Sequence, residues 1–306
     1  MKALLFGCNG QIGWELHRAL LPSFEILALS RGGSSGFKGD LFDLLSLTQT
    51  IQTFKPDIIF NAAAYTNVDK AETEPKLAFF LNETAPAHIA NEAKKIGAFL
   101  VHYSTDYVFD GKKNRPWQEE DRPEPLNIYG LSKRAGEIAI QETGCNGLII
   151  RTSWIYSTRR RNFVKTILEI AKNEDKIDVV ADQTGVPTSA EFIADASIHM
   201  SLELLKKLPN DFRKIQIYHL SASGETTWYQ YAKLILERAG ELGYNLRASK
   251  ESIYPISSLE TKRLAKRPTY STLSNKKVIN DFQLNIPLWS SGVLRTLAEL
   301  KETCDG

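Results

Sequence analysis

Short apolar runs alternate along the first half of the chain with longer segments in which apolar side chains recur every three or four positions. The short runs predict buried β-strands, and the longer segments predict amphipathic helices. The expected strands are Lys2–Phe6, Phe24–Ser30, Asp57–Asn61, Phe99–Ser104 and Gly147–Ser153. The expected helices are Gln11–Leu21, Leu44–Phe54, Lys76–Ile96 and Ile128–Thr143, the third with a kink or break at Pro86.

This alternation of strands and helices predicts parallel strands joined by crossover helices. Leu148, Ile149 and Ile150 are apolar in succession, as strands of a sheet covered on both faces require. We therefore expect an α/β chain built on a Rossmann-type doubly wound parallel sheet, with a smaller substrate-binding lobe from the second half.

The pattern becomes less regular after Trp154. Helices are expected at Asn162–Lys172, Ala190–Leu205 and Thr227–Ala239, and a late strand at Ile215–Ser221. From this distribution we expect a first, Rossmann-type domain in residues 1–155, with later contributions from about 175–222. Residues of about 156–174 and 223–306 are expected to form the discontinuous substrate-binding lobe.

Composition narrows the class of protein. Of the 306 residues, 42% are hydrophobic, which is enough for a sizeable core, and the net charge of +2 gives no overall field to recruit nucleic acid or an anionic membrane. No apolar stretch is long enough to span a bilayer, and the apolar run at the N-terminus is too short for a signal peptide. The three cysteines, Cys8, Cys145 and Cys304, form no C-x-x-C pair. We expect a cytoplasmic protein without a disulfide framework.

The first predicted strand leads into a glycine-rich turn. Gly7, Gly10 and Gly13 form a G-x-x-G-x-x-G pattern that opens the first helix. Glycines permit a tight turn and let backbone N–H groups approach a diphosphate at a helix N-terminus. The context at the start of a βαβ unit therefore predicts dinucleotide binding, and the alternative is a plain strand-to-helix turn.

The second strand ends in Ser30 and Arg31, where NAD-binding sites usually carry Asp or Glu for the ribose hydroxyl. Serine and arginine can bind a 2′-phosphate that a carboxylate would repel. We therefore expect NADPH to be preferred, with NADH as the alternative cofactor and an ordinary surface arginine as the alternative interpretation. Asp40 and Leu41 should lie near the adenine, and Ala63 closes the third strand close to the cofactor or packs in the core.

Reduction of a ketone needs an acid near the new alkoxide, and a tyrosine beside a lysine ammonium can serve. A Tyr-x-x-x-Lys pattern places both side chains on one face of a helix, but about one such match is expected by chance. Tyr129 and Lys133 follow a strand that ends in Thr105, whose hydroxyl can bind a substrate carbonyl. The second match, Tyr229 and Lys233, follows no polar strand end and is interpreted as part of a packed helix.

Together these residues resemble the extended short-chain dehydrogenases, and within them the dTDP-4-dehydrorhamnose reductases. The matching stretches are Asn61–Glu72, Tyr103–Gly111, Pro125–Gly130, Arg151–Tyr156 and Asp182–Thr188. The resemblance implies reduction by NAD(P)H of the C4 ketone of dTDP-4-dehydro-L-rhamnose. It implies Tyr129 as proton donor and Lys133 as the residue that lowers its pKa and holds the nicotinamide ribose.

The resemblance also assigns binding residues. The cofactor contacts that it implies are Gly10, Gln11, Ile12, Asp40, Leu41, Ala64, Tyr65, Thr66 and Tyr103. The substrate contacts that it implies are Thr105, Asp106, Trp154, Gln183 and Arg267, the last of which could pair with the substrate diphosphate. Some members of the family carry acidic residues at a Mg²⁺-linked dimer contact, and Glu15 and Glu191 fall at two such positions. The resemblance thus suggests a homodimer and a bound metal ion, although two exposed helix glutamates are an equally good interpretation.

Alternatives stay open at this point. A reductase of another nucleotide-linked 4-keto-deoxysugar would share these motifs, and the fold also occurs in non-catalytic dinucleotide-binding regulatory subunits. Tyr107 stands where related dehydratases carry a glutamate, which disfavours dehydration. The basic run Arg159–Arg161 is interpreted as a solvated loop, with help to a phosphate-bearing substrate as the alternative.

Overall fold

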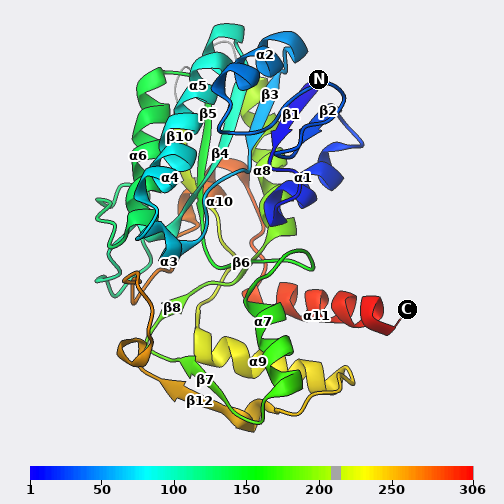
Figure 1. Cartoon of the computed structure of the whole chain (residues 1–306), viewed down its shortest axis with the longest axis vertical. Coiled ribbons are helices and arrows are strands. Elements are labelled where there is room, and N and C mark those ends of the chain that lie inside the picture. The colour runs from blue at the N-terminus through cyan, green and yellow to red at the C-terminus, as the bar shows by residue number, and fades with distance from the viewer. Residues whose placement is uncertain (208–214, 306) are drawn as a thin grey trace.

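The computed structural model describes residues 1–207 and 215–305. Its centre is a parallel sheet with the strand order β10-β5-β4-β3-β1-β2 (Figure 1). These strands are β1 (Lys2–Phe6), β2 (Glu25–Leu29), β3 (Ile58–Asn61), β4 (Phe99–Thr105), β5 (Gly147–Thr152) and β10 (Ile215–His219). Each lies within two residues of a predicted strand, and the expected doubly wound α/β fold is confirmed.

Helices cover both faces of this sheet (Figure 1). Alternate residues of a strand point to opposite faces, so Leu5 packs with α1 (Gln11–Leu20), α8 (Ala190–Lys207) and α10 (Lys276–Phe282). Leu4 and Phe6 pack on the other face, where α2 (Leu44–Phe54), α5 (Ala85–Ile96) and α6 (Ile128–Thr143) lie. Burial on both faces explains the unbroken apolar runs in the sequence.

The segment predicted as one helix over Lys76–Ile96 consists of three pieces. They are α4 (Pro75–Phe79), the π-helical turn η1 (Phe80–Thr84) and α5, and they follow the short helix α3 (Val68–Ala71). Pro86 lies in the first turn of α5, where a helix tolerates the missing N–H. The irregularity therefore precedes the proline as a widened turn.

The second half of the chain contributes a separate hydrophobic cluster, in the lower part of Figure 1. It is formed by α7 (Phe163–Asn173), α9 (Trp228–Glu241), α11 (Trp289–Asp305), and the parallel pair β7 (Ile177–Val180) and β12 (Ile253–Ile256). The strand β7 lies in the range expected to join the first domain, yet it pairs with β12. We call this part the lower lobe.

Two short ribbons lie between the sheet and the lower lobe (Figure 1). One pairs β6 (Ile155–Tyr156) with β9 (Thr188–Ser189), and the other pairs β8 (Thr184–Gly185) with β11 (Thr226–Thr227). The 3-10 turns are η2 (Asp106–Val108), η3 (Lys250–Ser252) and η4 (Ser258–Glu260). In the part of the chain that the structure describes, none of the helices has the length and apolar character to cross a bilayer.

Candidate functional site

The glycine-rich turn between β1 and α1 brings the backbone close to β3. Gly7 has φ +82°, and a Cβ added there would lie 2.7 Å from the backbone nitrogen of Ala63. A Cβ on Gly13 would lie 2.0 Å from the carbonyl oxygen of Gly7. Gly10 precedes α1 without a side-chain cap, so the first N–H groups of that helix are free of a capping partner. Such a helix N-terminus is suited to an anionic phosphate.

This turn forms one wall of a cavity of about 770 Å³. The structure brings together in it most of the residues predicted to contact the dinucleotide. They are Gly7, Gly10, Gln11, Ile12, Ser30, Arg31, Asp40, Leu41, Ala63, Ala64 and Thr66. Its size, its position at the carboxyl ends of the strands and the uncapped helix fit a dinucleotide.

Other lining residues were missed by the sequence analysis. They are Asn9, Gly32, Phe42, Leu81, Ile155, Arg160 and Arg161. Asn9 lies inside the glycine-rich turn, so its neighbours were a usable signal. Phe42 stacks on Phe80 with ring centroids 5.4 Å apart. These residues lie far apart in the sequence, so a local sequence pattern could not predict their contact.

Five predicted cofactor residues do not line this cavity: Gly13, Tyr65, Tyr103, Tyr129 and Lys133. Gly13 lies under the turn, as its contact with Gly7 requires. The hydroxyl of Tyr65 points elsewhere and donates a 2.8 Å hydrogen bond to Glu74. Burial and this carboxylate raise the pKa of Tyr65 to about 12. Its role as a cofactor contact stays a prediction.

Tyr129 and Lys133 lie one turn apart near the start of α6. The side chain of Asn127 caps this helix by accepting a 2.8 Å hydrogen bond from the N–H of Gly130. A Cβ on Gly130 would lie 2.2 Å from the carbonyl oxygen of Tyr107, so α6 packs directly on η2. This contact holds Tyr129 beside the end of β4, with its ring edge-on to Tyr107 at 5.8 Å.

Lys133 is buried behind the tyrosine. Its Nζ donates a 2.5 Å hydrogen bond to the carbonyl oxygen of Tyr103 and lies 3.2 Å from Nε2 of His102. Burial lowers the pKa of Lys133 to about 8, and the carboxylate of Glu137 opposes this shift. The ammonium group is therefore mainly charged at neutral pH and is held by groups on β4.

The environment of Tyr129 favours the protonated form of its hydroxyl. Burial raises the pKa of Tyr129 above its ordinary value, and a hydrogen bond with Thr105 opposes that shift. A protonated phenol is the form that can donate a proton to a developing alkoxide.

Thr105 and Asp106 lie at the carboxyl end of β4, as predicted. The Thr105 hydroxyl donates a 3.0 Å hydrogen bond to Oδ1 of Asp106 and accepts one of 3.2 Å from the N–H of Tyr107. Burial raises the pKa of Asp106 to about 7. Oδ2 of Asp106 has no hydrogen-bond partner among the described residues, although it is buried. An unpaired oxygen here is suited to a ligand hydroxyl.

The other predicted substrate residues come from the second half. Trp154 has φ +44° and stacks on Trp228 with centroids 3.5 Å apart, so it also packs against the lower lobe. Gln183 is buried two residues before Gly185, which contacts the Trp154 ring. Arg267 donates a 2.7 Å hydrogen bond to Asp69, so its charge is already partly compensated.

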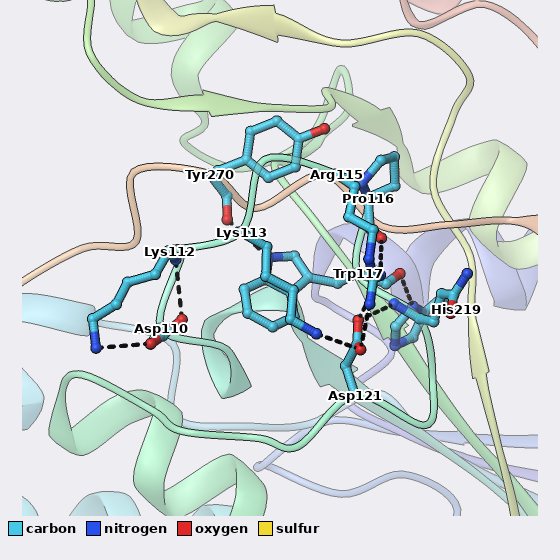
Figure 2. Close-up of polar contacts among 10 residues, drawn as sticks. Asp110, Lys112, Lys113, Arg115, Pro116, Trp117, Asp121, His219 and Tyr270 are labelled. Atoms are coloured by element: carbon cyan, nitrogen blue, oxygen red, sulfur yellow. Dashed lines mark hydrogen bonds and ion pairs between the residues drawn. The ribbon is translucent and has the colours of Figure 1, made fainter.

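The loop between η2 and α6, residues 109–127, contacts residues from the second half of the chain (Figure 2). Asp121 accepts hydrogen bonds of 3.0 and 2.9 Å from the two Nη atoms of Arg115. The indole N–H of Trp117 donates to the carbonyl oxygen of Tyr270 at 3.0 Å, and the carbonyl of Trp117 lies 3.0 Å from Nδ1 of His219. These contacts fix the segment beside Thr105 and Asp106 against residues more than 100 positions away.

The second Tyr-x-x-x-Lys pair lies on α9 in the lower lobe. Tyr229 packs against the hydrophobic cluster there, and Lys233 lies over its ring at 5.5 Å. The interpretation of this pair as part of a packed helix agrees with its place. Cys8 and Cys145 are free thiols, and the side chain of Cys304 lies outside the described residues.

Glu15 and Glu191 face each other across α1 and α8. Arg18 donates a 2.9 Å hydrogen bond to Glu15 and lies 3.9 Å from Glu191, which also pairs with Arg295. No cluster of three or more metal-binding side chains occurs among the residues that the structure describes. Guanidinium groups thus pair with both carboxylates in this structure, and the Mg²⁺ that the resemblance suggests stays a prediction.

The fold and the site define a Rossmann-type oxidoreductase similar to the short-chain dehydrogenases. The family model of the RmlD substrate binding domain matches residues 1–302. The dTDP-4-dehydrorhamnose reductases of Shigella flexneri and of Escherichia coli (strain K12) are each 44% identical to this chain over 303 residues, which is 99% of both chains. The chain therefore belongs to the dTDP-4-dehydrorhamnose reductase family.

A solved structure agrees with this assignment. The dTDP-4-dehydrorhamnose reductase from Bacillus anthracis in complex with NADP superposes with a TM-score of 0.83 and 33% identity. The match covers 97% of this chain and 99% of that chain. The resemblance seen in the sequence motifs is thus confirmed over the whole chain.

Proposed function

We propose that this protein catalyses the NADPH-dependent reduction of the C4 ketone of dTDP-4-dehydro-L-rhamnose to dTDP-L-rhamnose. The observation that carries the proposal is the meeting of Tyr129, Lys133 and Thr105 at the carboxyl end of β4, in a chain that is 44% identical to curated reductases of this name. The class of substrate is a nucleotide-linked keto sugar.

Each side chain has a distinct part in the proposed reaction. NADPH, when bound in the cavity beside the glycine-rich turn, would supply the hydride for the carbonyl carbon. Thr105 binds the carbonyl oxygen and Tyr129 donates its phenolic proton to that oxygen. The ammonium of Lys133 stabilises the phenolate that remains, because a nearby positive charge favours the ionised phenol.

Asp106 supports the proposal through its unpaired buried oxygen, which can accept a hydrogen bond from a sugar hydroxyl. Trp154, Gln183 and Arg267 would complete the substrate side. Arg267 would have to exchange part of its pairing with Asp69 for a phosphate oxygen. The preference for NADPH over NADH rests on Ser30 and Arg31, which line the cavity at the end of β2, where NAD-binding sites usually carry an acidic residue.

We also propose that the sheet with its helices forms the dinucleotide-binding domain and that the lower lobe, including β7, forms most of the substrate-binding domain. The separate hydrophobic clusters support this division. Action in the cytoplasm is part of the proposal, in keeping with free Cys8 and Cys145. The homodimer suggested by the resemblance stays a prediction.

The test generates dTDP-4-dehydro-L-rhamnose in situ with the upstream dehydratase and epimerase and follows NADPH absorbance after this protein is added. Consumption of NADPH with formation of dTDP-L-rhamnose would establish reaction, substrate and cofactor together. NADPH that binds but is not consumed would overturn the proposal and point to another keto sugar or to a regulatory subunit.

A further inference from the structure

The dinucleotide cavity has a third wall that comes from the segment between β6 and α7. This segment, residues 157–162, follows β6 directly. Its Arg160 and Arg161 line the cavity, as does Ile155 of β6. The glycine-rich turn and the end of β2 form the other walls. A basic segment that leads into the lower lobe therefore reaches the proposed cofactor site.

Hydrogen bonds attach the segment to the start of α1. Both Ser157 Oγ and Asn162 Nδ2 donate to Oε1 of Gln11, at 3.1 Å each. Asn162 also donates a 2.7 Å hydrogen bond to the carbonyl oxygen of Ser157 and caps α7 by accepting from the N–H of Lys165 at 3.3 Å. The segment is thus fixed beside the helix end whose N–H groups are uncapped.

The three arginines of the segment differ in their partners. Arg159 lies over the ring of Trp14 at 3.6 Å, a cation–π contact outside the cavity lining. Arg160 donates from Nε to the carbonyl oxygen of Asn9 at 2.7 Å, which leaves its Nη atoms for another acceptor. Neither Arg160 nor Arg161 forms an ion pair with a carboxylate of the described residues, whose ion pairs with arginine involve other arginines.

We propose that Arg160 and Arg161 bind the diphosphate of the dinucleotide, together with the N-terminus of α1. Arg160 is bonded to Asn9, inside the turn where the diphosphate is expected, whereas the 2′-phosphate is expected at Ser30 and Arg31 on the end of β2. Two guanidinium groups without an acidic partner beside a cavity suit a diphosphate, because each can donate two hydrogen bonds to its oxygens. The inference rests on the proposed function in that this cavity is taken as the cofactor site.

This assignment has a consequence that separates it from the role of Arg31. NADPH and NADH share the diphosphate, so loss of Arg160 or Arg161 weakens the binding of both by the same factor. Loss of Arg31 weakens NADPH and leaves NADH nearly unchanged. Because Arg160 and Arg161 are solvent-exposed, each charge is expected to contribute about a 3- to 10-fold change in Kd.

The experiment measures Kd for NADPH, NADH and adenosine 2′-monophosphate, which lacks both phosphates of the diphosphate, by calorimetry on the full chain. The variants are Arg160→Gln, Arg161→Gln and Arg31→Ala. Arg159→Gln is the matched control, since it removes a neighbouring charge that does not line the cavity. Thermal unfolding without ligand checks that each variant folds, and Arg161→Gln removes no hydrogen bond that holds the segment.

The expected result is a similar loss of affinity for NADPH and NADH in Arg160→Gln and Arg161→Gln, with the affinity for adenosine 2′-monophosphate and the Arg159→Gln control unchanged. Wild-type affinity of both variants for both dinucleotides would overturn the inference. A loss confined to NADPH would also overturn it, because the contact would then be to the 2′-phosphate. A wild-type chain that binds neither dinucleotide would overturn the proposed function itself.

Discussion

At the scale of single residues, the hydroxyl of Tyr129 and the ammonium of Lys133 have different hydrogen-bond partners on β4. The hydroxyl of Tyr129 has a raised pKa through burial, while the ammonium of Lys133 donates to the carbonyl oxygen of Tyr103 and lies beside His102. A phenol in this state is a poor acid until it faces a developing alkoxide. The reaction is thereby tied to the arrival of the substrate carbonyl.

Replacement of Tyr129 by phenylalanine removes the proton donor and keeps the ring against Tyr107. We expect kcat to fall by about 100-fold or more, because general acid catalysis contributes about that much. The Kd for NADPH should stay close to the native value, since Tyr129 does not line the dinucleotide cavity. Steady-state kinetics and calorimetry check both, and a variant of full activity would remove the assigned role.

The raised pKa of Asp106 makes the free energy of unfolding depend on pH. Its folded-state pKa of about 7 lies above the ordinary value of 3.8, so the folded chain holds a proton that the unfolded chain has released between these values. A carboxyl group with a raised pKa stabilises the fold fully at low pH, and that contribution is lost as pH rises towards 7. Asp106→Asn carries no such charge at any pH.

The advantage of Asp106→Asn over the native chain is therefore expected to grow with pH. Between about pH 5 and pH 8 the difference in unfolding free energy should increase by roughly 2 kcal/mol in favour of the variant. Denaturant unfolding at the two pH values measures it, with Asp178→Asn, an exposed carboxylate on β7, as control. A difference that is constant with pH would contradict the raised pKa.

At the scale of elements, long periodic segments were predictable and their interruptions were not. The helix predicted at Ile128–Thr143 agrees with the structure at both ends, since Asn127 caps its start and Gly144 with φ +67° ends it. The π-helical turn η1 was missed because its cause is not local. Asn82 in this turn is buried and donates to Ser132 Oγ at 2.9 Å, and its Oδ1 accepts from the N–H of Tyr65.

In the candidate site too, residues in short sequence motifs were predictable and residues placed by long-range contacts were not. Turn glycines, the end of β2 and the Tyr129–Lys133 pair each lie in a short motif, so the sequence could place them. The roles of His102 and Arg160 depend on contacts with residues 31 and 151 positions away, respectively. Such contacts arise from the order of the strands and the path of the loops, and a local sequence pattern predicts neither.

The glycine-rich turn permits a prediction at this scale. Gly13→Ala would place a Cβ 2.0 Å from the carbonyl oxygen of Gly7, so α1 must move away from the turn. We expect a loss of stability of about 1–3 kcal/mol, with much weaker NADPH binding. Gly240→Ala on α9 is the matched control, because no atom lies within 4 Å of its Cβ, and it should be neutral or slightly stabilising. Equal behaviour of the two variants would refute the close approach.

At the scale of the whole molecule, the proposed cofactor cavity joins both parts of the chain. Its walls include the turn after β1 and the segment that leads into α7 of the lower lobe. A ligand that binds this cavity in the folded state should stabilise both parts. The site thus lies where the sheet and the lower lobe meet.

NADPH at about a hundred times its Kd is therefore expected to add about 2.7 kcal/mol to the free energy of unfolding. Hydrogen exchange should slow in residues 157–162 as well as in residues 7–13. Protection confined to the glycine-rich turn would show that the lower segment does not take part. NADPH mixed with a Gly13→Ala variant that still folds gives the baseline without strong binding.

The strand order has a consequence for the synthesis of the chain. Strand β10 pairs with β5, yet roughly 60 residues separate them in the sequence. During synthesis, one edge of β5 therefore stays unpaired until these residues have been added. At about 5–20 residues per second this takes roughly 3–12 s. During that time Leu148, Ile149 and Ile150 present an apolar edge to other nascent chains. Chains that stop before β10 are therefore expected to aggregate more readily than complete chains.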